Sequence, residues 1–381
     1  VAISLITVFI FMPALILRTY PLIDKTQHRP FTPSFRSFGK FVNRVMMPLV
    51  IVFAICIAPC YLASNANSFY YGASHIFGSA TQLGMDTEKI EAAFGQRDTY
   101  VLMVPNGSTA TEAALSEALH KIPQVKSILS YVDTVGITIP EQYLDSGTRS
   151  KLNGAHYTRM ILTVNAAYEG ADTFSLVEAV RSTAEHYYPG QWYLAGEGVS
   201  TYDLMDTVTD DMVKVNLVAI GAVFLILLLT MKSLILPVIL VLSIETAIWM
   251  NLSIPYFSDQ TIFYIAYLII SSIQLGATVD YAILLTDRYR EMRQRCPKQE
   301  AVIATISAVS VSILTSASVL TVVGFLLGAF STHGLLSQLG YFLGKGTLCS
   351  LAIVLLVLPG LLYLFDNCII PHKSSKEAST T

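Results

Sequence analysis

An acidic side chain, Asp280, lies inside a stretch that is otherwise apolar from Ile262 to Leu285. Inserting a carboxylate at the centre of a membrane helix costs about 2.5–3.5 kcal/mol, so such a group persists where protein or water solvates it. The next residue, Tyr281, carries a hydroxyl that can donate or accept a hydrogen bond. The pair predicts a site that binds a proton or another cation. A structural acid inside a helix bundle is the alternative.

Small residues share the helical face of this acid. Gly276 and Ser272 lie one and two turns before Asp280, and residues at this spacing fall on one side of a helix. Small side chains let a second helix come close. We therefore expect Asp280 to be buried against another helix, where desolvation disfavours its charged form, and to be reached by water through an outer cavity.

The composition is that of a membrane protein, because 53% of the residues are hydrophobic and only 13% are charged, against about 25% charged in soluble proteins. The net charge of -3 averages two unlike regions. The sequence contains no phosphate-binding loop of the Gly-x-x-x-x-Gly-Lys-Ser/Thr kind, and none of its five cysteines lies in the long polar segment. We expect no cofactor, no metal site, no disulfide framework and no nucleic-acid partner.

Seven apolar segments can be separated from the polar ones. The predicted spans are residues 1–17, 45–63, 213–231, 234–252, 262–286, 301–330 and 339–365. Between and after them come a basic connector at 18–44, a soluble domain at 64–212 and a polar, disordered tail at 366–381. The last five spans form a helix bundle over residues 213–365.

Basic residues set the expected orientation. The connector carries Arg18, Lys25, Arg29, Arg36, Lys40 and Arg44 against Asp24 alone, and the loop from Asp287 to Gln299 is also basic. Short basic loops stay in the cytoplasm. The chain is therefore predicted to cross the cell membrane several times, with its C-terminus cytoplasmic and its soluble domain extracytoplasmic.

The soluble domain has the pattern of a mixed α/β fold. Strands are predicted at 99–104, 125–132, 160–166 and 191–195, and helices at 108–122 and 172–188. The order β-α-β-β-α-β is that of the ferredoxin-like unit. Residues 203–214 are expected to connect this domain to the bundle. The domain contains far more acidic than basic residues, which indicates solubility, with attraction of cations as the weaker alternative.

Several other polar residues fall within predicted spans. Glu245 is a second acid in a span, and Lys345 could pair with an acid or extend its ammonium group toward water. A stripe of hydroxyl groups follows the 301–330 span, with Thr315 at its edge. Its candidate relay members are Ser310, Thr315, Ser318 and Thr321. Close helix packing is the favoured interpretation of this stripe, and transfer of protons beside Asp280 is the alternative.

A short repeat suggests a duplicated architecture. Ser4, Leu5 and Pro13 recur at one offset as Ser350, Leu351 and Pro359. We therefore expect residues 1–17 to be the last helix of a preceding repeat, and the chain to be the second half of a transporter.

The sequence resembles the MMPL-type transporters of the resistance-nodulation-division (RND) superfamily. The similarity lies in Gly-Ala-Thr-Val-Asp-Tyr at 276–281, Asp-Arg-Tyr-Arg-Glu at 287–291, Thr-Ser-Ala at 315–317, Val-Gly-Phe at 323–325, Gly-Lys-Gly at 344–346 and Leu-Pro at 358–359. The arrangement of one helix, a large outer domain and five helices covers nearly the whole chain.

The resemblance implies a mechanism. In such transporters an Asp-Tyr pair in each half faces its counterpart and relays protons, so Asp280 and Tyr281 would be the pair of this half. The expected function is export of lipids, drugs or other hydrophobic cargo, driven by the proton gradient. The expected partners are the N-terminal half, membrane lipids and the cargo.

Three other functions fit parts of the pattern. A protein-export auxiliary shares the same architecture, and a sterol- or lipid-sensing scaffold would not pump at all. An intramembrane aspartyl protease needs two apposed aspartates, whereas Asp280 is the only Asp at the centre of a span and Glu245 is a poor substitute. We therefore expect no enzyme activity.

Overall fold

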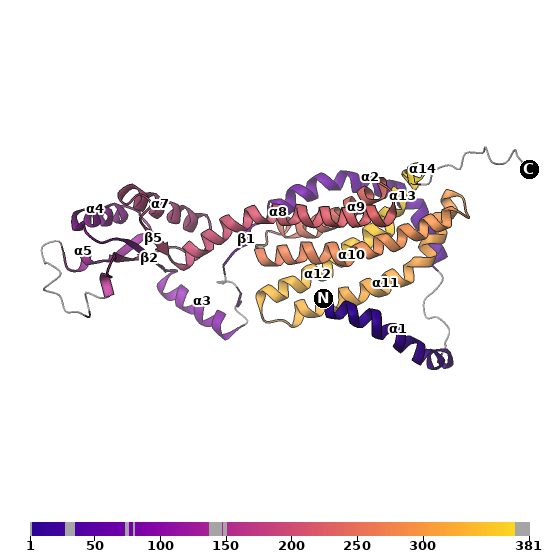
Figure 1. Ribbon diagram of the computed structural model, residues 1–381, viewed down its shortest axis with the longest axis horizontal. Coiled ribbons are helices and arrows are strands. Elements are labelled where there is room, and N and C mark those ends of the chain that lie inside the picture. Colours follow the sequence, from indigo (N-terminus) through magenta and orange to yellow (C-terminus); the bar gives the residue numbers. More distant parts are fainter. Residues whose placement is uncertain are drawn as a thin grey trace, which may run out of the picture.

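The computed structural model describes residues 2–26, 35–72, 76–78, 81–136, 147 and 151–369. The molecule is elongated, with a bundle of long helices at one end and a small α/β region at the other (Figure 1). Within the described residues, seven helical segments are long and apolar enough to cross a membrane. They are α1 (Ala2–Lys25), α2 (Arg36–Asn65), α8 (Glu197–Met231), α9 (Ile235–Phe257), α10 (Tyr264–Arg293), α11 (Lys298–Phe330), and the joined series α12 (Gly334–Ala352), a π-helix (Ile353–Val357) and α13 (Leu358–Leu364).

Several helices extend beyond the predicted spans. Helix α1 continues to Lys25 and α2 begins at Arg36, so the parts of the 18–44 segment that the structure describes are largely helical. Residues 27–34, which include Arg29, lie outside the described residues. Hydropathy locates the stretch that fits the hydrocarbon, about 30 Å thick, whereas a helix can continue past it into water. The predicted spans 1–17 and 45–63 are therefore shorter than the helices that contain them.

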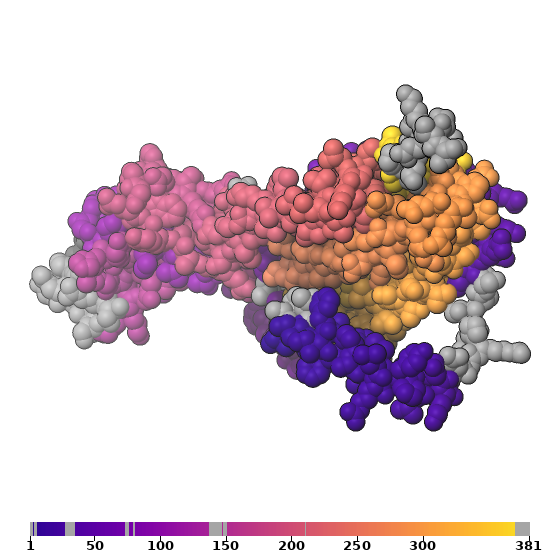
Figure 2. Space-filling model, turned by 45° about the vertical axis from the view of Figure 1, so that its right-hand side comes forward, coloured from indigo at the N-terminus to yellow at the C-terminus, as the bar shows by residue number. Residues whose placement is uncertain are grey.

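Helix α1 lies apart from the core of the bundle. Figure 2 shows it in indigo as a separate ridge on the outside of the molecule. Its apolar side chains are exposed, and Phe9 and Leu17 retain 73% and 77% of their accessible surface. These side chains are suited to contact with lipid or with another helix.

The α/β region contains a four-stranded antiparallel sheet in the order β3-β4-β2-β5. This is the strand order of the ferredoxin-like unit, so the predicted fold class is confirmed. The strands are β2 (Asp98–Pro105), β3 (Val125–Leu129), β4 (Tyr157–Val164) and β5 (Tyr193–Ala195), and the helices of this region are α3 (Gln82–Phe94), α4 (Thr109–His120), α5 (Tyr131–Thr134) and α7 (Ala171–Tyr187). Alternate residues of β2, such as Leu102 and Val104, point into a core shared with Leu162 of β4 and Val177 of α7.

One predicted strand is too long. The chain leaves β3 after Leu129, and the predicted strand 125–132 gives way to α5. Ser130 caps this helix, because its side-chain oxygen accepts a hydrogen bond from the Asp133 N–H at 3.2 Å. A serine that can satisfy a free N–H of the first turn favours the start of a helix.

A second, very short sheet was not predicted. Strand β1 (Phe69–Tyr70), just after α2, pairs in parallel with β6 (Ile262–Phe263), just before α10. The segment 253–261, predicted as an outer loop, is helical as far as Phe257. The sheet joins the start of the α/β region to the start of the helix that carries Asp280.

Helix α8 runs without interruption from the α/β region into the bundle (Figure 1). It contains 35 residues and includes the whole of residues 203–214, the predicted connector. The Tyr264 hydroxyl of α10 donates a hydrogen bond to the Val208 carbonyl of α8 at 2.7 Å. The connection is therefore one continuous helix rather than a flexible linker.

Helices α11 and α12 meet through glycines. A Cβ added at Gly324 would lie 2.6 Å from the Gly344 nitrogen, and one added at Gly340 would collide with the Gly328 nitrogen. Only a residue without a side chain allows two backbones to come this close, as in other membrane helix pairs. The part of α11 that contains Gly324 and Gly328 is thus a packing surface.

Replacing Gly340 by Ala should destabilise the protein by about 1–3 kcal/mol, because the added methyl group forces the two helices apart. Gly221 of α8 provides a matched control, since a Cβ there meets no atom within 4 Å. Gly221→Ala should leave stability unchanged or raise it by up to about 1 kcal/mol. Unfolding in mixed micelles measures both, and equal stability of the two variants would contradict this packing.

The start of the tail is ordered rather than disordered. Asp366 begins a short helix, α14 (Asp366–Ile369), and keeps 2% of its accessible surface. Arg293 donates to both of its oxygens, at 2.8 and 3.0 Å, the Tyr289 hydroxyl donates at 2.8 Å, and the Lys298 ammonium lies 3.3 Å away. Burial raises the pKa of the Asp366 carboxyl, but the hydrogen bonds from Arg293 and Tyr289 outweigh it, and the pKa lies below the usual range. The prediction of disorder is wrong for residues 366–369.

The ion pairs should make the docking of α14 dependent on pH. A carboxyl group with a depressed pKa stabilises the folded state fully above its ordinary pKa of about 4, and loses this contribution as the pH falls through the folded-state pKa. Hydrogen exchange of the Cys368 and Ile369 amides, corrected for intrinsic rates, should accelerate at acidic pH. In Asp366→Asn it should already be fast at pH 7, and unchanged protection in that variant would exclude this role.

Candidate functional site

Asp280 lies near the middle of α10, on a face that no described helix covers. Its side chain is exposed, and so are Ser272 and Gly276 on the same face. A Cβ added at Gly276 would meet no atom within 4 Å. The three residues form an open polar strip along a helix that is otherwise suited to hydrocarbon. The expectation that Asp280 is buried is wrong for this chain alone.

Tyr281 points the other way, into the bundle. It is buried, and its hydroxyl lies 3.3 Å from the Ser316 hydroxyl of α11. The Asp-Tyr pair is therefore divided between two faces, with the acid on the open strip and the phenol at the α10–α11 interface. Ser316 was missed as a site residue, although the Thr-Ser-Ala motif at 315–317 contains it.

The hydroxyl stripe of α11 is not one continuous surface. Ser310 is buried and donates to the Ile306 carbonyl at 2.6 Å, and Thr315 is exposed and donates to the Val311 carbonyl at 2.8 Å. Ser318 is exposed, whereas Thr321 is buried beside the glycines that contact α12. Hydroxyl groups that donate to their own helix are already satisfied. The structure thus does not bring the four predicted hydroxyl groups together around Asp280.

Glu245 lies inside the bundle, on α9. It keeps 4% of its accessible surface, and its Oε1 atom has no hydrogen-bond partner within the described part of the chain. Tyr267 of α10 is close enough to interact electrostatically with Glu245. A buried carboxylate oxygen without a partner is energetically costly. Glu245 is thus a second protonatable group, placed in the interior rather than on the open strip.

Lys345 is half-buried on α12. Its ammonium group lies 5.3 Å from the centre of the Phe342 ring, and it borders a cavity of about 420 Å³ that Gln338 and Tyr341 also line. No carboxylate within the described ranges forms an ion pair with it. Of the two predicted arrangements, extension of the ammonium toward a polar cavity fits better than pairing with an acid.

A buried amide network, which the sequence analysis missed, joins α9, α10 and α12. The Asn251 amide donates to the Gln274 Oε1 atom and to the Phe342 carbonyl, each at 3.0 Å. The Gln274 amide in turn donates to the Gly346 carbonyl at 3.2 Å and to the Ser350 hydroxyl at 3.1 Å. A side chain at Gly346 would collide with both amides. This network holds α10 in a defined rotation about its axis.

Within the described residues there is no group of three or more His, Cys, Asp or Glu side chains that could hold a metal ion. The chemistry available at membrane depth is that of carboxyl, hydroxyl and amide groups. A carboxyl group can exchange a proton in the physiological pH range when its environment raises its pKa.

Together, the bundle and the inserted sheet define a multi-pass α-helical membrane protein with an α/β insertion. A model of the MMPL family matches residues 76–380, which is most of the chain, and the chain belongs to this family. MMPL proteins are membrane transporters of the RND type and not enzymes. The resemblance drawn from the sequence motifs is thereby confirmed.

One relative is a protein of Streptomyces coelicolor whose name describes it only as a membrane protein. The two sequences are 32% identical over 181 residues, which is 46% of this chain and 25% of the relative. The aligned part thus spans about a quarter of the length of the curated relative.

Replacing Asn251 by Leu should destabilise the bundle by about 1–3 kcal/mol, because Gln274 loses a buried hydrogen-bond donor. Leu at both positions should cost less than the sum of the two single changes, since the two amides contact each other. Gln299→Leu, at an exposed position of α11, serves as control. Unfolding free energies in mixed micelles test this, and simple additivity would argue against a network.

Proposed function

We propose that this chain is one half of a proton-driven exporter of lipids, drugs or other hydrophobic molecules, and that Asp280 is its proton-binding group. The observation that carries the proposal is the open strip of Ser272, Gly276 and Asp280 on a membrane helix. A carboxylate facing hydrocarbon would be costly. The small neighbours leave room for another helix, so the strip suits a contact with the N-terminal half that the family resemblance implies.

Tyr281 and Glu245 have supporting roles in this proposal. The contact between the hydroxyl groups of Tyr281 and Ser316 fixes the phenol at the α10–α11 interface, on the other face of the helix from Asp280. The free Oε1 atom of Glu245 offers a second place for a proton inside the bundle. A proton on Asp280 removes the desolvation cost of its charge, so protonated and ionised states favour different helix contacts.

The available energy is sufficient to shift such a conformational equilibrium. Moving one elementary charge through 100 mV is worth about 2.3 kcal/mol, which changes a two-state ratio by a factor of about 50. Helix α8 then carries the movement toward the α/β region, because it is continuous between the two parts. The α/β region would open and close an outer path for the cargo.

The orientation belongs to the same proposal. The basic loops at 18–44 and 287–299 favour a cytoplasmic position, which puts the α/β region on the outer side of the cell membrane. Protons entering from outside would then reach Asp280 from the side of the α/β region.

Asp280→Asn should abolish proton uptake, because an amide does not titrate. The measurement is the signal of a pH-sensitive dye trapped in vesicles that carry the complete transporter, after an inward proton gradient is imposed. Asp287→Asn, an exposed acid two turns further along α10, is the matched control and should keep its flux. We expect at least a tenfold loss in the first variant.

The same experiment separates the alternatives. Full proton uptake by Asp280→Asn would overturn the assignment of the proton site. Wild-type vesicles without any uptake would favour a lipid- or sterol-sensing scaffold. Uptake accompanied by loss of secreted proteins, rather than of exported lipids, in cells carrying Asp280→Asn would favour the protein-export auxiliary.

A further inference from the structure

The helix that carries Asp280 is attached to the chain segment that enters the α/β region. Strand β6 ends at Phe263, directly before the first residue of α10, and it pairs with β1. The Ile262 N–H donates a hydrogen bond to the Ser68 carbonyl at 3.0 Å. Any displacement of the outer end of α10 therefore also displaces residues 69–72.

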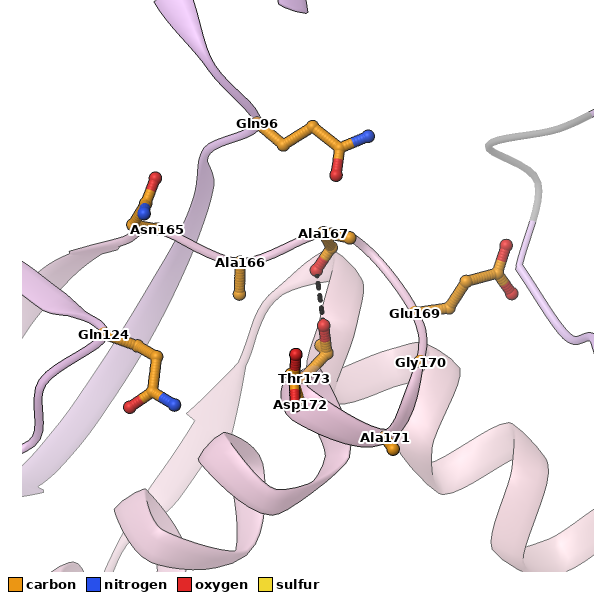
Figure 3. A pocket seen from close by; sticks show the side chains of 10 residues that line it. All are labelled: Gln96, Gln124, Asn165, Ala166, Ala167, Glu169, Gly170, Ala171, Asp172 and Thr173. Atoms are coloured by element: carbon orange, nitrogen blue, oxygen red, sulfur yellow. Dashed lines mark hydrogen bonds between the residues drawn. The ribbon is translucent and has the colours of Figure 1, made fainter.

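A carboxylate of the α/β region holds the same segment from the other side. Glu169, between β4 and α7, accepts hydrogen bonds from the Tyr71 N–H at 2.8 Å and the Gly72 N–H at 3.1 Å. In Figure 3 its side chain points away from Gln124 and Asn165. Hydrogen bonds to an ionised acceptor are roughly twice as strong as neutral ones.

Aromatic rings reinforce this attachment. The Tyr71 ring is stacked on Tyr264 of α10, with centroids 5.4 Å apart, and contacts Phe174 of α7 at 6.5 Å. Phe69 contacts Tyr264 and Tyr267 edge to face, at 5.5 and 5.3 Å. Such pairs stabilise a contact beyond the area they bury. The rings thus form a continuous series from α10 to α7.

We propose that Glu169 is a positioning residue that couples the movement of α10 to the α/β region. The proposal rests on the proposed function, since it gives the route by which a change at Asp280 reaches the cargo path. Helix α8 provides one connection, but a single helix can pivot about its end. The hydrogen bonds of Glu169 provide a second connection, and two connections convert a tilt into a defined displacement.

The position of Glu169 also connects this contact with a cavity. Glu169 is one of the residues that line a polar hollow of about 650 Å³ at the start of α7, together with Gln96, Gln124, Asn165 and Asp172 (Figure 3). The carboxylate itself points away from Gln124 and Asn165 and accepts the hydrogen bonds of the β1 segment, so the hollow borders the loop that carries Glu169.

The test measures movement and needs no cargo. Spin labels at Lys126 of β3 and at Asp287 of α10, both exposed, report the distance between the α/β region and the cytoplasmic end of α10. The labels are introduced as cysteines into the complete protein, with its native cysteines, five of them in this chain, replaced by Ser. Asp280→Asn, which resembles the protonated state, should shift the distance distribution. In a Glu169→Ala background this shift should be lost.

Glu185→Ala is the matched control. Glu185 also accepts two N–H groups, from Trp192 at 2.6 Å and Gly190 at 3.1 Å, but both lie within the α/β region. Its removal should leave the shift intact. Glu169→Gln, which keeps one acceptor oxygen, should restore part of the shift and protects the test against a folding defect in the Ala variant.

The outcomes are distinguishable. An undiminished shift in folded Glu169→Ala would overturn the coupling role. An equal loss in Glu185→Ala would mean that the carboxylate only stabilises the α/β region, and would also overturn it. No shift from Asp280→Asn in any background, together with no proton uptake by the wild type, would instead remove the proposed function.

Discussion

Hydrocarbon offers no hydrogen bonds, so each polar side chain in the bundle needs a partner within the protein. Hydroxyl groups such as Ser310 and Thr347 meet this need by donating to their own helix, and the amides of Asn251 and Gln274 meet it by bonding across helices. The buried hydroxyl groups of Thr286, Thr305 and Thr321 have no partner among the described residues, and two carboxyl groups also depart from this pattern. Glu245 keeps an oxygen without a partner among the described residues, and Asp280 lies on an open face.

Helix α10 carries both satisfied polar groups and an open carboxyl group, because one of its sides packs in the bundle and the other is exposed. Gln274 and Thr278 are buried on the inner side and fix the helix against its neighbours, while the outer side presents the proposed proton site. Its N-terminal end continues from β6 and its C-terminal end is bound to Asp366 through Arg293. A helix held at both ends and along one side can respond to a charge on the other side by a limited, directed movement.

Much of the fold could be predicted from the sequence. The apolar runs located the seven spans, since length and hydropathy are a sufficient signal, and the alternation of strands and helices was enough for the ferredoxin-like order. The β1–β6 pair could not be predicted, because each strand has two residues and the partners are far apart in the sequence.

The candidate site was predictable only in part. Asp280 and Tyr281 stood out because an acid in an apolar run is rare, and the motifs around them led to the right family. Asn251 and Gln274 were not recognised as partners, because a single amide in an apolar segment does not indicate which residue it contacts. The expected burial of Asp280 was wrong for this chain alone, because burial depends on which helix covers α10.

The length of α8 has a mechanical consequence. At 1.5 Å per residue its 35 residues extend about 50 Å, well beyond the roughly 30 Å of hydrocarbon. About two fifths of its length therefore exceeds what the hydrocarbon needs, at the end that joins the α/β region. A tilt of about 5° about the middle of the bilayer moves that end by about 3 Å. A small displacement of α8 within the bilayer thus becomes a larger displacement at the end of the helix beside the sheet.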